Sequence, residues 1–336
     1  MPSVTSPADL TRVSEEARQR QARYEKTVVL CAGTGCQAGG GLAVQAAFRN
    51  ALARHGLEDR VLVRPTGCHG FCEQGPLAII EPENILYCHV RPEDVTEIVE
   101  RTLLQGQVIE RLLYTDPVSH QRVVHEAEVP FYRAQERVLL GQNKRLDPCQ
   151  IEDYFALGGY SALAKVLTSM SPEQVIAEVR EAGLRGRGGG GFPTAIKWET
   201  SRRAPGQPKV VICNADEGDP GAYMNRSVLE GNPHAVIEGM LIGAYAIGAT
   251  QGFIYVRTEY PLAVERVRLA VEQARATGLL GERILGSDLC FDIKVSRGAG
   301  AFVAGESTAL MLALNGQVSE PRPKDVHTAV EGYRNL

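Results

Sequence analysis

Four cysteines in two close pairs place the strongest constraint on how the first third of this chain can fold. Cys31 and Cys36 are separated by four residues, and Cys68 and Cys72 by three. Each pair is expected in a loop that follows a strand, with glycine among the residues between the thiols. Such loops allow the backbone to fold around an inorganic core and to direct N–H groups at its sulfurs. Four thiolates from two loops are the ligands that a [2Fe–2S] cluster requires.

Zinc and disulfides are the alternatives for these thiols. The two ligands of a pair in a structural zinc knuckle are typically closer in sequence than the cysteines of these pairs. The spacing of the cysteines and the composition of the loops therefore favour the cluster over zinc. Disulfides conflict with the reducing compartment expected for this chain. His69 is expected beside the cluster, because four cysteines already suffice as ligands. The other four cysteines are isolated, and packing in the core is their default interpretation: Cys88, Cys149, Cys213 and Cys290.

The composition excludes several classes of function. The chain has 336 residues, 44% of them hydrophobic and 23% charged, and is long enough for two domains. Its formal net charge of -4 does not indicate nucleic acid or an anionic membrane surface, since both require clustered positive charge. The most apolar segment, residues 236–249, is too short to span a bilayer and contains Glu238. The first 25 residues contain no apolar core of signal-peptide type. We expect a cytoplasmic protein without a transmembrane segment.

The pattern of apolar residues divides the chain into four parts. Residues 1–25 are expected to form a charged helical arm or a disordered tail, and residues 105–148 a polar linker. Residues 26–104 have the order β-α-β-β-β-α, which suits a small α/β domain. In residues 149–336, strands near 210–213, 253–256 and 291–295 alternate with helices near 233–248 and 260–276. This alternation predicts a mainly parallel sheet with helices on both faces.

A glycine-rich loop lies in the second domain, between Gly183 and Thr194. Its formal G-x-G-x-x-G, from Gly186 to Gly191, follows a predicted helix that begins with Ser171 as its cap, so it is not a Rossmann fingerprint. Backbone without Cβ atoms can still lie flat against a planar or phosphorylated ligand. A flexible linker is the alternative, but the loop runs directly into Phe-Pro and Lys-Trp, which favours a ligand loop.

Two further segments follow predicted strands. The first contains Asn214 and three acidic residues, Asp216, Glu217 and Asp219, which would suit nucleotide hydroxyls, a divalent cation or simply a solvated turn. Ligand-binding loops are expected at the carboxyl ends of parallel strands. The second segment, residues 297–306, leads into a predicted helix over 307–314 whose N-terminus is a candidate phosphate site.

These motifs resemble two known families. Residues 26–104 resemble the thioredoxin-like [2Fe–2S] ferredoxin domain. Residues 160–324 resemble the flavin-bearing, NADH-oxidising subunit of complex I, of bidirectional and electron-bifurcating hydrogenases and of NAD-linked formate dehydrogenases. The resemblance implies a Rossmann-like domain that binds FMN in a non-standard way. It also implies an oxidoreductase subunit with iron–sulfur partner subunits. Because the cofactors carry this chemistry, we assign no general acid or base.

The resemblance also assigns residues to cofactors. The cluster ligands would be Cys31, Cys36, Cys68 and Cys72. FMN would contact Gly186, Arg187, Gly188, Gly189, Gly191, Lys197, Asn214, Asp216, Glu217, Gly305 and Glu306. NADH would contact Phe192, Asp219, Phe302 and Lys324.

The chain departs from the resembled family in two ways. It stops before the family's remaining flavin-contact segment, ubiquitin-like domain and [4Fe–4S] cysteines, so no [4Fe–4S] cluster is expected within these residues. Four positions where the family has NADH-site aromatics, a hydroxyl or a second carboxylate are changed, at Thr200, Phe302, Ser307 and His327. The alternative function is therefore an FMN/[2Fe–2S] relay or scaffold that does not bind NADH. A structural subunit without flavin is disfavoured by the intact glycine loop, Asn214 and Asp216.

Overall fold

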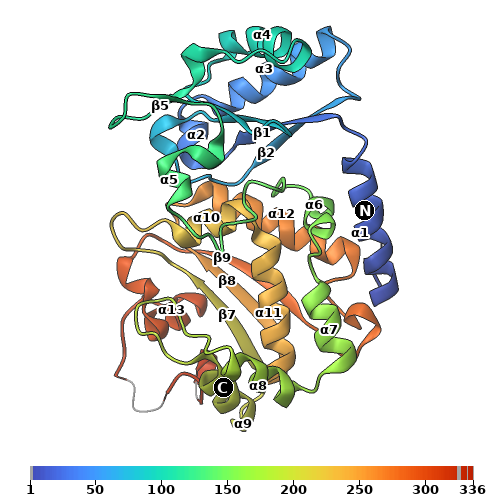
Figure 1. Cartoon of the computed structure of the whole chain (residues 1–336). Coiled ribbons are helices and arrows are strands. Elements are labelled where there is room, and N and C mark those ends of the chain that lie inside the picture. Colours follow the sequence, from blue (N-terminus) through green and yellow to red (C-terminus); the bar gives the residue numbers. More distant parts are fainter. Residues whose placement is uncertain (1–2, 324–326, 331, 336) are drawn as a thin grey trace. The chain divides into compact units, whose positions relative to one another are not determined.

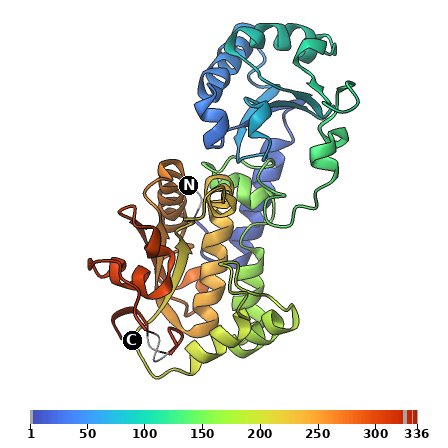
Figure 2. The same cartoon turned by 90° about the vertical axis from the view of Figure 1, so that its left-hand side faces the viewer.

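Two units, each with its own sheet, make up the computed structural model, which describes residues 3–323, 327–330 and 332–335 (Figures 1 and 2). The N-terminal unit contains residues 15–156 and 230–232, and the C-terminal unit contains the other described residues. In the described ranges, no helix is both long enough and apolar enough to cross a membrane.

A four-stranded mixed sheet forms the centre of the N-terminal unit. Its strands lie in the order β2-β1-β3-β4, with β1 parallel to β2 and the other neighbours antiparallel. The strands are β1 (Lys26–Cys31), β2 (Val61–Thr66), β3 (Ala78–Glu81) and β4 (Ile85–Tyr87). The helices are α2 (Thr34–Ala38), α3 (Gly41–Arg54) and α4 (Val95–Glu97), which continues as a π-helix over Ile98–Leu104. The expected β-α-β-β-β-α order is confirmed, with α2 as an addition.

Alternation along β1 supplies two cores, one on each face of this sheet. Val28 and Leu30 pack with Phe48 of α3 on one face. Val29 and Cys31 point to the other face, as the two-residue period of a strand requires. The second core therefore contains cysteine thiols.

The segment expected to be a linker packs against the N-terminal unit. Ile109 and Leu112 join the core that contains α3, whereas Tyr114 and Val129 join the core on the opposite face. Its elements are β5 (Tyr114–Thr115), β6 (Arg122–Val123) and α5 (Pro130–Arg133), followed by α6 (Ile151–Ala156). Short pieces of structure thus extend the unit beyond residue 104.

A three-stranded parallel sheet organises the C-terminal unit, in the order β7-β8-β9. These strands are β7 (Lys209–Ala215), β8 (Ala249–Val256) and β9 (Asp292–Arg297). Helices α11 (Pro233–Ile247) and α12 (Pro261–Thr277) cover one face, and α13 (Ser307–Leu314) lies on the other (Figure 2). The predicted parallel sheet with helices on both faces is confirmed.

Five further helices have not yet been described. They are α1 (Pro7–Gln21), α7 (Ser161–Ser169), α8 (Pro172–Glu181), α9 (Thr194–Arg203) and α10 (Met224–Gly231). The first confirms the helical form of the N-terminal arm, with Leu10, Val13 and Ala17 buried at helical spacing. Ser171 caps α8 as the sequence predicts, because its hydroxyl accepts a hydrogen bond from the Gln174 N–H at 3.3 Å.

A buried polar network fixes α7, α11 and α12 together. The two ring nitrogens of His234 lie 2.9 Å from the Tyr160 hydroxyl and 3.0 Å from Gln273 Oε1. The Glu238 carboxylate accepts the Tyr160 N–H at 2.8 Å and the Leu163 N–H at 3.1 Å. Burial lowers the pKa of His234 to about 4. The imidazole is therefore held neutral.

This network predicts a loss of stability in acid. The unfolded chain binds a proton on His234 near pH 6.5, whereas the folded unit does so only near pH 4. The contribution of neutral His234 to the free energy of unfolding is therefore complete above pH 6.5. It is lost as the pH falls towards 4, by about 3 kcal/mol in total. Denaturant unfolding at pH 7, 5.5 and 4.5 measures this loss. His234→Gln should show a shallower fall, and parallel curves for the two proteins would contradict the prediction.

Candidate functional site

The four predicted cluster cysteines come together in the N-terminal unit. Cys31 ends β1, Cys36 lies in α2, Cys68 follows β2, and Cys72 begins the short helical turn Cys72–Gln74. Cys68 and Cys72 have their sulfurs 3.6 Å apart, and Cys31 hydrogen-bonds with both Cys36 and Cys68. Cys36 was expected in a loop and lies in a helix instead. The five residues of α2 are too few to show a helical period in the sequence.

Three glycines leave the space that these cysteines occupy. A Cβ at Gly33 would lie 2.8 Å from Cys68 Cβ, and one at Gly75 would lie 2.7 Å from Cys36 Sγ. A Cβ at Gly35 would lie 3.0 Å from Cys72 Sγ. Side chains at these positions would displace the thiols, so glycine is required for the close approach.

Backbone N–H groups and neighbouring thiols set the electrostatics of this site. Hydrogen bonding with Cys36 raises the pKa of Cys31 to about 12, and hydrogen bonding with Cys31 raises that of Cys68 to about 11. The same bond from Cys31 lowers the pKa of Cys36. Gly70 donates its N–H to Cys68 Sγ at 3.3 Å, Gly33 donates to the Cys31 sulfur, and Leu77 donates to the Cys36 sulfur. Donors aimed at sulfur stabilise thiolates, which a cluster requires.

The chemistry of these donors fits a [2Fe–2S] cluster. Three features of the site suit a cluster: the four converging thiols, the three glycines and the N–H donors. His69 is fully buried, with Nε2 2.8 Å from the Thr66 hydroxyl.

The strand-end residues of the C-terminal unit form a second site. The Asn214 side-chain amide donates to the Gly305 carbonyl at 2.8 Å, and its Oδ1 accepts the Asp216 N–H at 3.1 Å. A Cβ at Gly305 would lie 3.1 Å from the Asp216 carbonyl oxygen, and one at Gly218 only 2.6 Å from the Phe302 ring. The end of β7 and the segment before α13 are therefore in direct contact. Burial raises the pKa of Asp216.

Two of the predicted ligand carboxylates hold the backbone of this site. Glu217 accepts the N–H groups of Asn225 at 3.0 Å and Arg226 at 3.2 Å. Glu306 caps α13 by accepting the N–H groups of Thr308 at 2.7 Å and Ala309 at 3.1 Å. The Glu306 carboxylate thus occupies two donors at this helix N-terminus, and the expectation of a phosphate there stays a prediction.

The glycine loop is a hairpin, and no other part of the chain that the structure describes packs against the glycines at its tip. The Gly186 N–H donates to the Phe192 carbonyl at 2.9 Å, and the Arg185 guanidinium donates to the Gly191 carbonyl at 3.2 Å. A Cβ at any of Gly188, Gly189, Gly190 or Gly191 would meet no other atom within 4 Å. Space beside this backbone is thus available to a ligand.

The other predicted contacts surround these two segments. Phe192 and Phe302 are 53% and 66% exposed, which leaves their rings open to a ligand. Arg187, Lys197 and Asp219 are exposed as well. Lys324 lies outside the described residues. The structure brings Asn214, Asp216, Gly305 and Phe302 together, whereas the assignment of the glycine loop to the same ligand stays a prediction.

The glycine loop yields a direct test. Gly188→Val places a branched side chain where the free protein has open space, so folding should not change. If FMN lies against this backbone, its dissociation constant should rise at least tenfold, about 1.4 kcal/mol. Flavin fluorescence titration measures the constant, with Gly239→Ala in α11 as a control that also meets open space. Unchanged FMN binding in Gly188→Val would mean that the loop is only a linker.

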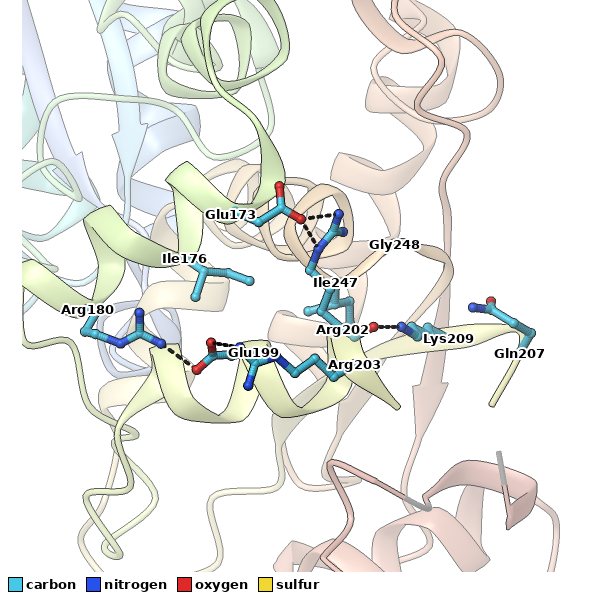
Figure 3. A pocket seen from close by; sticks show the side chains of 10 residues that line it. All are labelled: Glu173, Ile176, Arg180, Glu199, Arg202, Arg203, Gln207, Lys209, Ile247 and Gly248. Carbon is cyan, nitrogen blue, oxygen red and sulfur yellow. Dashed lines mark hydrogen bonds and ion pairs between the residues drawn. The ribbon is translucent and has the colours of Figure 1, made fainter. Parts of the chain in front are cut away.

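A cavity of about 580 Å³ lies at the opposite end of the strands, near the start of β7 and the end of α11 (Figure 3). Most of its charged groups pair with each other, whereas Lys209 donates to the Arg202 carbonyl. Glu199 lies 2.7 Å from both Arg180 and Arg203, and Arg202 lies 2.7 Å from Glu173. Arg202 also donates to the Ala246 carbonyl at the end of α11, at 3.2 Å. Arg202 thus stabilises the C-terminus of α11, and no predicted cofactor residue lines the cavity.

Both units match known families. Residues 17–103 match the family described as thioredoxin-like [2Fe-2S] ferredoxin. Residues 179–333 match the family described as the Nuo51 FMN-binding domain.

Curated relatives match part of this chain over part of their own length. The chain is 54% identical over 188 residues to the NADP-reducing hydrogenase subunit HndC of Solidesulfovibrio fructosivorans. This match covers 56% of this chain and 38% of that protein. It is 44% identical over 197 residues to an NADH-quinone oxidoreductase subunit of Rhizobium meliloti (strain 1021), covering 59% of this chain and 47% of that protein. The matched part is therefore less than half of each relative's length.

Solved structures match nearly the whole chain in fold. One of them is an NAD+-reducing [NiFe]-hydrogenase in the H2-reduced state, with a TM-score of 0.50 and 24% identity. The match covers 98% of this chain and 55% of that chain. At this identity the likeness shows the fold alone.

Proposed function

Because the chain joins a thioredoxin-like [2Fe-2S] ferredoxin domain to a Nuo51 FMN-binding domain, we propose that it is an electron-transfer subunit of an oxidoreductase complex. It moves electrons between NAD(H), FMN and iron–sulfur centres. The observation that carries this proposal is the pairing, in one chain, of four converging thiols with an FMN-binding domain whose strand-end segments meet.

Each cofactor has its own residues in this proposal. Cys31, Cys36, Cys68 and Cys72 hold the cluster. FMN lies on the glycine loop and the strand-end site. When bound at these residues, FMN would supply hydride chemistry and one-electron release, and the cluster would supply one-electron transfer.

The protein's own contribution is positioning. Asn214 ties the end of β7 to Gly305, which keeps two backbone segments beside each other before a ligand arrives. Glu306 and Glu217 fix the starts of α13 and α10 in the same way. A site prepared in this manner loses little conformational entropy when it binds its ligand.

Partners and compartment follow from the same proposal. Single electrons leaving the cluster require a further one-electron acceptor, so the partners are iron–sulfur subunits of a complex. No disulfide joins any of the eight cysteines, all of which lie within the described residues, and this suits the reducing cytoplasm.

Anaerobic addition of NADH to the chain loaded with FMN and cluster tests the function. Loss of flavin absorbance together with a new cluster EPR signal supports NADH as the donor. Reduction by dithionite but not by millimolar NADH would support the second candidate, a relay without a nicotinamide site. One observation favours this candidate. The Ser307 hydroxyl, at the position where the resembled family has a second carboxylate, donates to Glu306 Oε1 at 3.0 Å and so engages the one carboxylate that is present. A protein that retains neither FMN nor iron would contradict both.

A further inference from the structure

Residues 126–143, named here the clamp segment, lie outside the part of the chain that matches the ferredoxin family. They nevertheless contact the loop of residues 67–72, which carries two of the proposed cluster ligands, at three points. The Asn143 carbonyl accepts the Gly67 N–H at 2.9 Å, and the Arg137 guanidinium donates to the His69 carbonyl at 2.8 Å. The Phe131 ring stacks on Phe71 with centroids 4.7 Å apart and planes 9° from parallel.

Aromatic side chains make this side of the loop apolar. Phe71 also meets Tyr114 at 5.3 Å and Tyr132 at 5.5 Å between ring centroids. These rings belong to, or pack against, the core that contains Cys31 and Cys36. Cys31 and Cys36 are buried in this core, and charges act more strongly in such surroundings than in water.

Arg137 places a positive charge at this loop. In addition to its bond with His69, its Nε donates to Gln135 Oε1 at 2.9 Å, and its guanidinium lies 5.0 Å from the centre of the Tyr132 ring. A Cβ at Gly70 would lie 3.4 Å from Arg137 Nη2. The charge is therefore held beside the backbone that joins Cys68 to Cys72.

We propose that Arg137 is a positioning residue of the clamp segment that raises the reduction potential of the [2Fe–2S] cluster. This rests on the proposed function, because it assumes that the four thiolates hold the cluster. One electron enters the cluster, and no bond forms or breaks. The added negative charge is stabilised by a nearby cation in apolar surroundings, so the reduced state is favoured.

The test is an EPR-monitored redox titration of the full chain with FMN bound. Arg137→Gln should lower the equilibrium constant for one-electron reduction about tenfold, which is 59 mV. Arg137→Lys should stay close to the wild type, because it keeps the charge. Arg133→Gln is the matched control, since Arg133 lies in the same segment but is exposed, and it should have no effect.

The outcomes separate this inference from the proposed function. A potential that is the same in Arg137→Gln, Arg133→Gln and wild type would overturn the role of the charge. If Arg137→Gln does not retain a cluster, Arg137→Lys decides the question, since a large negative shift in that variant would overturn the proposal. A wild-type protein without a cluster would instead contradict the proposed function.

Discussion

Replacing Cys36 with alanine removes the [2Fe–2S] cluster and leaves the FMN content unchanged. Alanine offers no sulfur, and three thiolates cannot complete the ligand set of the cluster. The residues proposed to bind FMN belong to the other unit, which has its own sheet and its own core. Separate units usually fold independently, so the flavin should remain. The visible absorbance and EPR signal of the cluster, with iron and FMN quantified on the same sample, measure the result.

Cys88 provides the matched control. It is 3% exposed and lies in the same core as Cys31 and Cys36, but it is not a proposed ligand. Burial raises its pKa to about 12, as expected for a cysteine that serves packing. Cys88→Ala should therefore keep its iron. Stoichiometric zinc without iron in the anaerobically purified wild type would contradict the cluster assignment.

Features with a local sequence signal could be predicted, and features that depend on distant contacts could not. The cysteine spacing predicts convergence of the four thiols, and the Ser171 capping box predicts the start of α8. The strand-end position of Asn214 and Asp216 predicts the second site. In each case a few neighbouring residues contain the whole signal.

The clamp segment and the role of Glu306 were missed for different physical reasons. Phe131 and Arg137 contact a loop that lies about 60 residues or more away in the sequence. The clamp segment itself has no regular spacing of apolar residues that would have indicated its structure. The capping role of Glu306 had a signal, because an acidic residue stands directly before the predicted helix of residues 307–314. Its carboxylate was assigned to a ligand instead, and the structure shows it bound to the helix N–H groups.

NADH is expected to bind this chain at least a hundredfold more weakly than relatives that keep the family's nicotinamide-site residues. Thr200 and His327 replace aromatics, and each lost stacking contact is worth about 0.5–1.5 kcal/mol. Phe302 lacks the hydroxyl of the family's tyrosine, and its exposed ring can offer only stacking. Each lost hydrogen bond to a charged group costs about 1.5–3 kcal/mol. At about 1.4 kcal/mol for each power of ten, two or three such losses account for the expected change.

The position of Ser307 makes this prediction directly testable. Where the family has a second glutamate, the Ser307 hydroxyl donates to Glu306 Oε1, and Glu306 is committed to capping α13, so neither residue offers a free carboxylate. Ser307→Glu combined with Phe302→Tyr should therefore lower the NADH dissociation constant about tenfold or more without changing FMN binding. Anaerobic calorimetric titration of the FMN-loaded wild type and double variant with NADH measures the two NADH dissociation constants, and flavin fluorescence titration measures FMN binding. A low-micromolar constant in the wild type would overturn this prediction and favour the NADH-oxidising function over the relay.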